Sequence, residues 1–511
     1  MIDYGALHEK HWAQLIPAVS PSYNTAWVKA SNSDRPLRNN IIQDDLNFLK
    51  RSSPLFYLDK VLYSAGLAAG KKDYDLVKDK AGHDAELTGD SGGYQAATGT
   101  LKWAMREWLE NLLPFTEEYC DFCPIADLPT SAIANNPDDD DDDDDGEEAK
   151  PARKPFKNHV DRLMMNNGFD PTIAENPNET LHTLITKNKL SPEFNTCLWY
   201  TKYNTEWILA NKNPDANTKW LNVIQGIGLD ESEAWLKEMI NYPLDGMCFP
   251  AQHLTRMEQT LNAISRLWDG GMLGKYKRLH FLGTGQAQNF VVYSEVLKQI
   301  QKHVNPDISC TGDVSSAVYE TKQGNMAVGF TIGNGEWAVQ RIHASKPAAL
   351  KEGQKKEPSE LANMPPNTNL EEALLHLWKK RYFGGTRVAK GWIETDSLVY
   401  RNDDPRFFVR TEIAKLLTVS DIFDLSRGKH GTDNLAYLYM YNHNLQVYAQ
   451  SVYTALQYSD AAHPMFTSPT LEKVKMAIRN VFESPPEDRL DYIFVNRKEL
   501  NIPDWINGKS R

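Results

Sequence analysis

Hydrophobic and polar positions follow two alternating periods in the middle of the chain. Short apolar runs that predict strands begin at Leu221, Leu244, Arg278 and Asp307, and segments with helical spacing begin at Asp230, Leu254 and Asn289. Strands that alternate with helices in this way predict βα units and a parallel sheet. Glycines and polar residues follow the strands, at the carboxyl ends where such folds collect their chemistry.

The pattern changes towards the two ends of the chain. After about residue 410 the spacing is helical, in segments that begin at Thr411, Asn434 and Pro469. The first 85 residues are rich in proline, asparagine and serine and predict no definite element. No internal repeat of fixed period is present.

Length and composition allow one large domain or two to three smaller ones. The chain has 511 residues, of which 41% are hydrophobic, and it lacks the run of about 18 apolar residues that a membrane span needs. Its first residues lack the basic region and apolar core of a signal peptide. Five cysteines are few and odd in number, which suits a reducing compartment. We therefore expect a cytoplasmic protein without a membrane partner.

One acidic segment dominates the net charge of −12. Eight aspartates from Asp138 to Asp145 are followed by Glu147 and Glu148, and without these ten charges the chain is nearly neutral. Like charges in a run repel one another and cannot be buried, so we expect residues 138–150 to form a disordered insertion. The alternative is a self-docking tail that covers a basic surface, such as the basic stretch from Pro151.

A short polar segment near residue 90 combines several chemical groups. Residues 89–95 read GDSGGYQ, which joins the Asp90 carboxylate to two glycines, an aromatic ring and an amide. Paired glycines allow positive φ and a close approach of backbone to a ligand. The segment predicts either a surface turn or a ligand-binding loop.

Four such fragments occur in order at predicted strand ends. They are GDSGGYQ from Gly89, VIQGI from Val223, DGMCFPA from Asp245 and SCTGDV from Ser309. In this order they resemble the tRNA-guanine transglycosylase superfamily, whose members exchange a guanine in nucleic acid for a 7-deazaguanine. The resemblance covers about residues 85–330 and implies an α/β fold, an irregular (β/α)8 TIM-type barrel with insertions and a helical C-terminal region.

The resemblance also implies a division of the chain. Residues 1–137 are expected to form an N-terminal region and the first part of the barrel, and residues 138–150 the acidic insertion. Residues 151–340 would supply the main βα units. Residues 341–511 would hold the end of the barrel and the helical region.

Two carboxylates carry the chemistry that the resemblance implies. A base exchange that keeps the configuration at C1′ calls for two displacements, as in retaining glycosidases. The superfamily's nucleophile falls on Asp313, and Asp90 matches the residue that acts as general acid and base and binds the base.

The remaining site residues transfer by position. Tyr94 and Leu282 match the side chains on the two faces of the purine, and Gln225 matches the amide that binds its carbonyl. Asp127 matches the carboxylate that reads the N–H edge of the base. The family's glycine pair is replaced here by Pro250 and Ala251, and proline has no N–H to donate. The full substrate-binding set that the resemblance implies is Ser91, Gly92, Gly93, Tyr94, Asp127, Gln225, Gly226, Ala251 and Leu282.

The zinc site of the superfamily is incomplete. Its histidine matches His443 in an HNL sequence, but no cysteine follows Cys310, and one ligand cannot make a closed tetrahedral site. Cys120 and Cys123 have zinc-like spacing without a second pair, which favours thiols of the core or a loop. We expect no metal and no cofactor.

Residues 376–392 are the best nucleic-acid segment. Lys379, Lys380, Arg381 and Arg387 have no acidic neighbour there and alternate with aromatic residues, among them Trp378. Cations follow phosphates and rings stack on bases. The alternative is an edge hairpin that lysines keep soluble.

The choice of nucleic acid follows from the departures. The incomplete zinc site, the acidic insertion and the divergent ends resemble the DNA branch of the superfamily, which inserts 7-deazaguanines such as preQ0 into DNA. A tRNA enzyme is the first alternative, and a non-catalytic nucleic-acid-binding subunit is the second. An unrelated barrel glycosidase would not need the GGYQ segment. The sequence leaves open whether the chain forms a homodimer.

Overall fold

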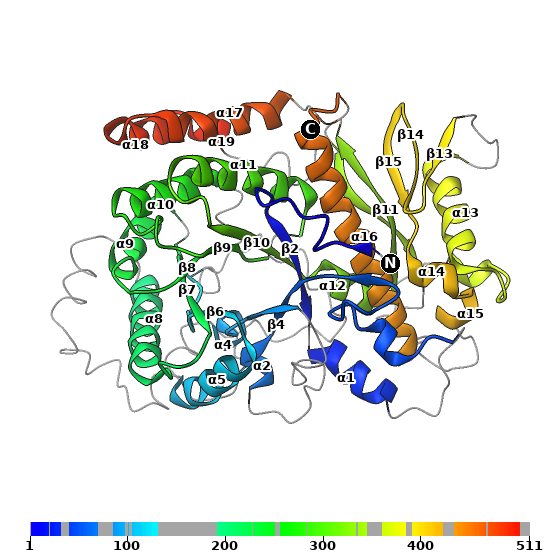
Figure 1. Cartoon of the computed structure of the whole chain (residues 1–511), viewed down its shortest axis with the longest axis horizontal. Helices are drawn as coiled ribbons and strands as arrows, with labels where there is room; N and C mark the ends of the chain where they lie inside the picture. Colours follow the sequence, from blue (N-terminus) through cyan, green and yellow to red (C-terminus); the bar gives the residue numbers. More distant parts are fainter. Residues whose placement is uncertain are drawn as a thin grey trace.

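Eight parallel strands close into a barrel that occupies one side of the molecule (Figure 1). The computed structural model describes residues 2–19, 21–31, 40–69, 85–97, 101, 105–130, 192–226, 228–250, 256–283, 285–333, 336–344, 360–384, 391–422, 434–464, 466 and 469–500. The acidic insertion at 138–150 and the basic stretch that follows it lie outside these residues.

The barrel strands follow one another in the chain and pair in the same order. They are β2 (Gln14–Val19), β4 (Lys60–Tyr63), β5 (Glu86–Gly89), β6 (Phe122–Pro124), β7 (Lys219–Val223), β8 (Gly246–Phe249), β9 (Arg278–Phe281) and β10 (Ser309–Val314). β10 pairs with both β9 and β2, which closes the ring. The expected (β/α)8 barrel is confirmed, and its first two strands lie in the region where no element was predicted. A separate short pair joins β1 (Ile2–Asp3) to β3 (Phe56–Tyr57).

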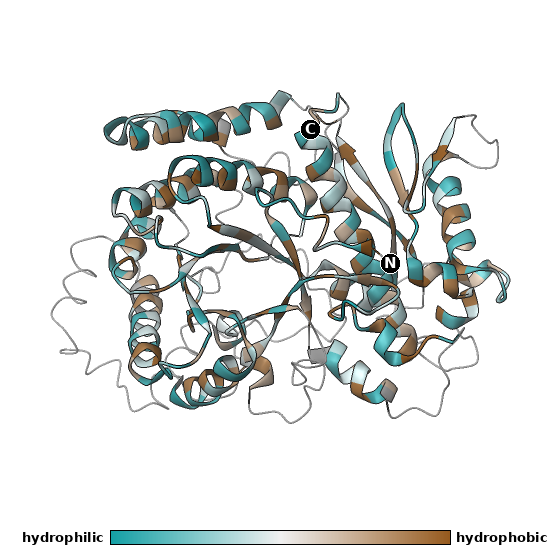
Figure 2. Cartoon of the chain, in the orientation of Figure 1, coloured by the Kyte–Doolittle hydropathy of each residue, from teal (hydrophilic) through white to brown (hydrophobic). Residues whose placement is uncertain are grey.

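Helices surround these strands. The described ones are α1 (Pro21–Ser31), α2 (Ala65–Ala68), α4 (Gly93–Ala97), α5 (Met105–Tyr119), α8 (Pro192–Asn211), α9 (Leu229–Met239), α10 (Met257–Asp269), α11 (Ala287–His303) and α12 (Ser316–Lys322), with a 3₁₀ turn η1 (Gln43–Leu46). The segments from Asp230, Leu254 and Asn289 form α9, α10 and α11 as predicted. α10 shows why: Leu261, Ile264 and Leu267 are buried one or two turns apart, while Arg266 is exposed. Figure 2 shows this mixture of hydrophobic and hydrophilic residues on the helices around the barrel.

A second sheet lies beyond the barrel. It is antiparallel, with the order β12 (Glu336–His343), β11 (Asn325–Gly333), β15 (Asp404–Val409), β14 (Leu398–Arg401) and β13 (Trp392–Glu394). η6 (Leu361–Asn363), α13 (Leu370–Phe383), α14 (Glu412–Leu416) and α15 (Val419–Ile422) accompany it. Residues 341–511 were expected to hold the end of the barrel. Among the described residues the last barrel strand ends instead at Val314, because β10 already pairs back to β2.

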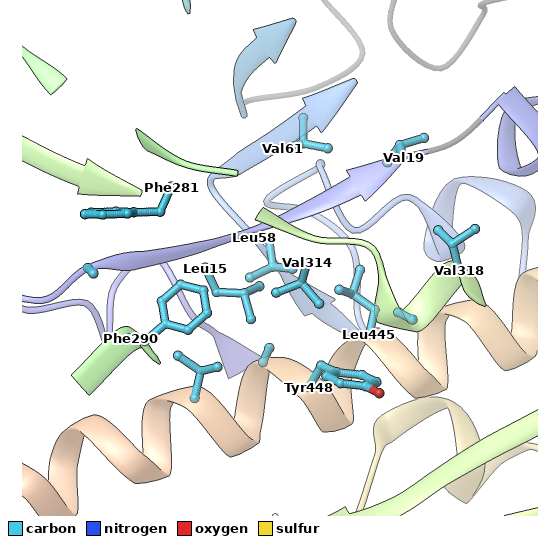
Figure 3. Packing of buried hydrophobic residues seen from close by; sticks show 14 of the residues in the cluster. Leu15, Val19, Leu58, Val61, Phe281, Phe290, Val314, Val318, Leu445 and Tyr448 are labelled. Atoms are coloured by element: carbon cyan, nitrogen blue, oxygen red, sulfur yellow. The ribbon is translucent and has the colours of Figure 1, made fainter. Parts of the chain in front are cut away.

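The C-terminal region is helical, as expected. It contains α16 (Asn434–Asp460), α17 (Pro469–Glu483), α18 (Pro486–Val495) and α19 (Arg497–Leu500). α16 runs between the barrel and the second sheet (Figure 1), and its Leu445 and Tyr448 lie near Leu15 and Val314 of the barrel strands (Figure 3). α17 is tied to α11 by a bidentate ion pair from Arg479 to Glu295, at 2.7 and 3.0 Å. None of the helices in the described ranges has the length and apolar character of a membrane span.

A largely buried ion pair spans the barrel near the amino ends of its strands. Arg278 at the start of β9 reaches across to Glu86 at the start of β5, with N–O distances of 2.5 and 3.0 Å. The guanidinium also lies 3.7 Å from the centre of the Phe122 ring. Burial alone would raise the pKa of Glu86, but the adjacent Arg278 holds this pKa below its ordinary value. The carboxylates named in the sequence lie at the opposite ends of the strands.

Candidate active site at the carboxyl ends of the barrel strands

Asp90 is held between the ends of two neighbouring strands. It follows β5 directly, and its backbone N–H continues the ladder to the Tyr63 carbonyl of β4 at 2.7 Å. One carboxylate oxygen accepts from the Gly92 N–H at 3.1 Å, and the other accepts from the Ser64 hydroxyl at 3.4 Å. The carboxylate is therefore oriented by backbone and side chain from both strands.

The two glycines after Asp90 are required by the backbone itself. Gly92 has φ of +84°, which a side chain would strain. A Cβ on Gly93 would lie 2.2 Å from the Asp127 carbonyl oxygen. Ser91 is buried, and its carbonyl accepts from the Trp108 indole N–H at 3.0 Å. The segment is thus a packed loop between strand ends, and its second glycine admits the backbone at Asp127.

Asp127 and Gln225 form a direct contact. Asp127 lies three residues beyond β6 and Gln225 two residues beyond β7, and the Gln225 amide donates to the Asp127 carboxylate at 2.6 Å. Both side chains are buried. The amide oxygen of Gln225 has no hydrogen-bond partner in the described part of the chain. Next to it, the Gly226 N–H donates to the Thr130 hydroxyl at 3.1 Å.

Asp313 lies near the end of β10 with its carboxylate almost fully buried. One carboxylate oxygen accepts from the Gly283 N–H at 2.6 Å. The same oxygen lies 3.7 Å from Nε2 of His280, whose ring is completely buried. The Asp313 carboxylate therefore lies next to one backbone donor and one imidazole.

The three carboxyl groups influence one another. Burial raises the pKa of Asp127 and the pKa of Asp313 to about 7 each, and the charge of Asp90 adds to both shifts. Burial also raises the pKa of Asp90, against the stabilising hydrogen bonds from Gly92 and Ser64. The strand ends therefore bring together three buried carboxyl groups whose pKa values are all raised, which is typical of acid–base sites.

The two side chains expected to lie on the faces of the purine are more exposed than the carboxylates of the site. Tyr94 lies on α4 and its residue surface is 56% exposed, while Leu282 is partly exposed and its N–H donates to the Phe249 carbonyl at 2.8 Å. Ala251 lies outside the described residues. Stacking of Tyr94 and Leu282 on a purine stays a prediction.

The first part of the basic segment lies at the end of α13, on the other side of α16 from the barrel (Figure 1), with Lys380 and Arg381 in the last turn of the helix. Lys380 and Arg381 are exposed there, and Lys379 lies over the Trp392 ring with its ammonium 5.0 Å from the ring centre. Trp378 was expected to alternate with these cations as a base-stacking ring. It is instead buried, and its N–H donates to Gln340 at 2.6 Å. Arg387 lies outside the described residues.

The residues that match the superfamily's zinc site do not fit a metal. Nε2 of His443 donates to the Ala327 carbonyl at 2.6 Å, and Nδ1 bonds to the Thr411 hydroxyl at 2.7 Å, so both ring nitrogens are engaged. All five cysteines are buried free thiols. Within the described ranges no group of three histidine, cysteine or acidic side chains is arranged to hold a metal ion. His443 has a structural role.

His280 and Thr311 are site residues that the sequence analysis missed. Nδ1 of His280 lies 2.9 Å from the Thr311 hydroxyl oxygen, on the neighbouring strand. The available signal was the alternation of Arg278 and His280, which places both on the same side of β9. Ser64, in the region without predicted elements, had no comparable signal.

The chain matches no protein-family model and no curated protein. A function can therefore be inferred only from the residues at the strand ends and their chemistry.

Proposed function

We propose that this protein is a base-exchange transglycosylase. It replaces a guanine in DNA with a 7-deazaguanine such as preQ0, through a covalent intermediate between Asp313 and the nucleotide. The observation that carries the proposal is the gathering of Asp90, Asp127 and Asp313 at one end of the barrel, with Gln225 bound to Asp127.

The raised pKa values suit a pair of carboxyl groups with different tasks. A nucleophile must be ionised and an acid must hold its proton, and the charge of Asp90 opposes the ionisation of Asp313. Near neutral pH the two groups favour a state with one proton between them, as in other carboxylate pairs. Asp313 is assigned as the ionised member because the resemblance places the nucleophile there, and the Gly283 N–H, which donates to it at 2.6 Å, supports the ionised form.

The reaction balances in two displacements. In the first, a carboxylate oxygen of Asp313 attacks C1′, the bond from C1′ to the base nitrogen breaks, and the proton of Asp90 goes to the departing guanine. In the second, Asp90 takes a proton from the incoming 7-deazaguanine, whose nitrogen attacks C1′ and releases Asp313. The configuration at C1′ is kept, and Asp90 ends with the proton it began with.

Asp127 and Gln225 supply base recognition. Guanine and its 7-deaza analogues present N–H donors beside a carbonyl; the Asp127 carboxylate is an acceptor for such donors, and the Gln225 amide can donate to the carbonyl. Both side chains are buried, so a base that does not match their hydrogen bonds would leave buried polar groups unsatisfied, which costs binding energy.

DNA is the proposed nucleic acid because the chain lacks the cysteines of the tRNA enzymes' zinc site. In a duplex the target nucleotide must be flipped out of the stack before C1′ can be attacked, at a cost of about a few kcal/mol. Exposed Lys380 and Arg381 on α13 are cations that can contact phosphates.

The test is an exchange assay with labelled DNA and, in parallel, labelled tRNA. Wild type and Asp313→Asn are incubated with each substrate and a 7-deazaguanine, and nucleosides and denaturation-resistant adducts are analysed. Asp307→Asn is the matched control, because Asp307 is an exposed carboxylate just before the same strand, paired with Lys10 at 3.1 Å.

The expected result is exchange and adduct with DNA in wild type and in Asp307→Asn, and neither in Asp313→Asn. Exchange only with tRNA would reverse the choice of nucleic acid. Adduct that persists in Asp313→Asn would falsify the assignment of the nucleophile. Nucleic-acid binding without exchange on either substrate would favour the non-catalytic subunit.

A further inference from the structure

A completely buried imidazole lies beneath the Asp313 carboxylate. His280 lies on β9 directly opposite Thr311 of β10 in the strand register, and Asp313 follows two residues later on the same side of β10. Nδ1 of His280 is 2.9 Å from the Thr311 hydroxyl oxygen, and Nε2 is 3.7 Å from Asp313 Oδ1. Nε2 has no hydrogen-bond partner in the described part of the chain.

The hydroxyl of Thr311 decides which ring nitrogen carries the proton. A neutral imidazole has one N–H donor and one acceptor, and a hydroxyl can serve as either partner. If Thr311 donates to Nδ1, the ring proton is on Nε2 and points towards the carboxylate. If Nδ1 donates to Thr311, the bare Nε2 faces an ionised Asp313, which places two lone pairs against each other.

The same pair of residue types occurs a second time in this protein. His443 bonds to the Thr411 hydroxyl through Nδ1 and to the Ala327 carbonyl through Nε2. A carbonyl only accepts, so Nε2 of His443 carries the proton and Thr411 donates to Nδ1. In His280 the place of that carbonyl is taken by the Asp313 carboxylate.

We propose that His280 is a positioning residue for the nucleophile: Thr311 fixes the proton on Nε2, and Nε2–H donates to the Asp313 carboxylate when that group is ionised. This role rests on the proposed function, in which Asp313 attacks C1′. The contact shortens from 3.7 Å to hydrogen-bond distance as the negative charge develops. His280 then supplies a second donor beside the Gly283 N–H.

His280 acts as a neutral donor. Its pKa is lowered to about 3, mainly by burial and additionally by the positive charge of Arg278. The ring therefore holds a single proton at every pH at which Asp313 titrates, and it cannot form a charged pair with the carboxylate.

Among the described residues, three other charged or titratable groups are near Asp313. Asp90 at the end of β5 disfavours its ionisation. Arg278 lies on β9 and is ion-paired with Glu86. Cys248 of β8 is within electrostatic reach of Asp313 and of Asp127, and burial holds its thiol protonated by raising its pKa well above the usual value. The side chain of His280 is the donor that can be removed without changing any of these charges.

The test measures the titration of Asp313 directly, without the reaction. The full chain is labelled with carbon-13 at aspartate carboxyl groups, and the Asp313 signal is assigned by its loss in Asp313→Asn. In His280→Leu the pKa of Asp313 should rise by about one unit, the size expected for one lost hydrogen bond to a charged group. His280→Gln, whose amide N–H can replace Nε2–H, should restore most of the shift.

Thr311 provides a matched pair of variants. Thr311→Val keeps the shape and loses the hydroxyl, so it should shift the Asp313 titration upward, while Thr311→Ser keeps the donor and should leave it in place. An unchanged titration in both His280→Leu and Thr311→Val would overturn the proposal. Equal shifts in Thr311→Val and Thr311→Ser would overturn the role of the hydroxyl.

The outcome is independent of the proposed activity. If wild type performs no base exchange, the function fails while the titration still reports the contact between His280 and Asp313. If exchange occurs, its rate against pH gives a second readout, and the acid limb should move to higher pH in His280→Leu and Thr311→Val.

Discussion

The two buried histidines in the described part of the chain occupy opposite kinds of surroundings. His443 lies in the middle of α16, and both of its nitrogens meet groups that cannot ionise, the Ala327 carbonyl and the Thr411 hydroxyl. His280 lies in the barrel, and its Nε2 meets a carboxyl group with a pKa near 7. The residue types match, and the difference lies in what Nε2 faces.

This contrast extends to the regions around them. Beside His443, the Asn444 amide accepts from the Ala327 N–H at 2.8 Å and donates to Thr321 and to the Asn325 carbonyl, both at 3.0 Å. At the carboxyl end of the barrel, Gln225 keeps a buried acceptor unpaired. Side chains whose polar atoms are all bonded, such as His443 and Asn444, stabilise the fold, whereas a buried acceptor left unpaired, as in Gln225, is available to a ligand. The two regions should therefore respond to mutation in opposite ways.

The largest expected effect is on activity at the barrel. Asp313→Asn should lower the rate of base exchange by about 10³-fold or more, because the amide cannot act as the anionic nucleophile. Its affinity for nucleic acid should change little, since phosphate contacts dominate binding. Single-turnover exchange and a binding titration measure the two quantities. A parallel loss of affinity and rate would remove the contrast.

The next effect is on stability at α16. His443→Leu should lower the free energy of unfolding by about 3 kcal/mol, because the buried Ala327 carbonyl loses its His443 donor and the buried Thr411 hydroxyl loses the acceptor for its proton. Urea unfolding of the full chain measures this change. His280→Leu is the control and should lose clearly less stability, since it frees only one hydroxyl.

The third effect is the pH dependence of stability. Asp313 has a folded pKa of about 7, above the roughly 3.9 of an unfolded aspartate, so the folded state binds its proton more tightly. This contribution to stability is complete below about pH 4 and is lost as the pH rises through 7. Between pH 5 and 8, Asp313→Asn should therefore lose about 2–3 kcal/mol less than wild type. Thermal unfolding at both pH values measures the difference, and a larger loss in the variant would contradict the assigned burial.

A smaller effect tests whether the second sheet has a function as well. Changing Lys379, Lys380 and Arg381 together to glutamate should weaken nucleic-acid binding several-fold and flatten its dependence on salt. Binding measured across a salt series gives both quantities. If neither changes, the basic turn of α13 only complements the helix dipole at its C-terminus.

The smallest effect concerns metal. Because both nitrogens of His443 are already bonded, prolonged treatment with a chelator should leave the melting temperature unchanged. Elemental analysis of the untreated protein serves as the control, and one tightly held zinc per chain would show that the region around His443 is rearranged in solution.

The strands that the sequence predicted are those with a continuous apolar run followed by glycine or a polar residue. β7 to β10 have this form because strands of a parallel barrel are covered on both faces. β2 and β4 do not, since β2 is interrupted by Pro17 and β4 is followed closely by the apolar residues of α2, so that its run has no clear end. These two segments are strands because they pair with β10 and β5 in the closed ring, and the local sequence pattern does not show this pairing.

The candidate site divides in the same way. Asp90, Asp127, Gln225 and Asp313 were found because they follow or end strands within recognisable fragments. The contact between Asp127 and Gln225 joins residues 98 positions apart and depends on β6 and β7 being neighbours. His280 was missed because it lies inside a strand, where a buried polar residue looks like part of the core.

The position of α16 has a consequence for how the molecule unfolds. One helix supplies hydrophobic contacts to the barrel strand β2 and to β11 of the second sheet, and its residues from Leu438 to Ala449 are buried. Neither sheet can lose its partner without exposing that helix, so the two should melt in one cooperative transition rather than as separate units. A lesion at His443 would then be felt equally by hydrogen exchange in β2 and in β11, on both sides of the molecule.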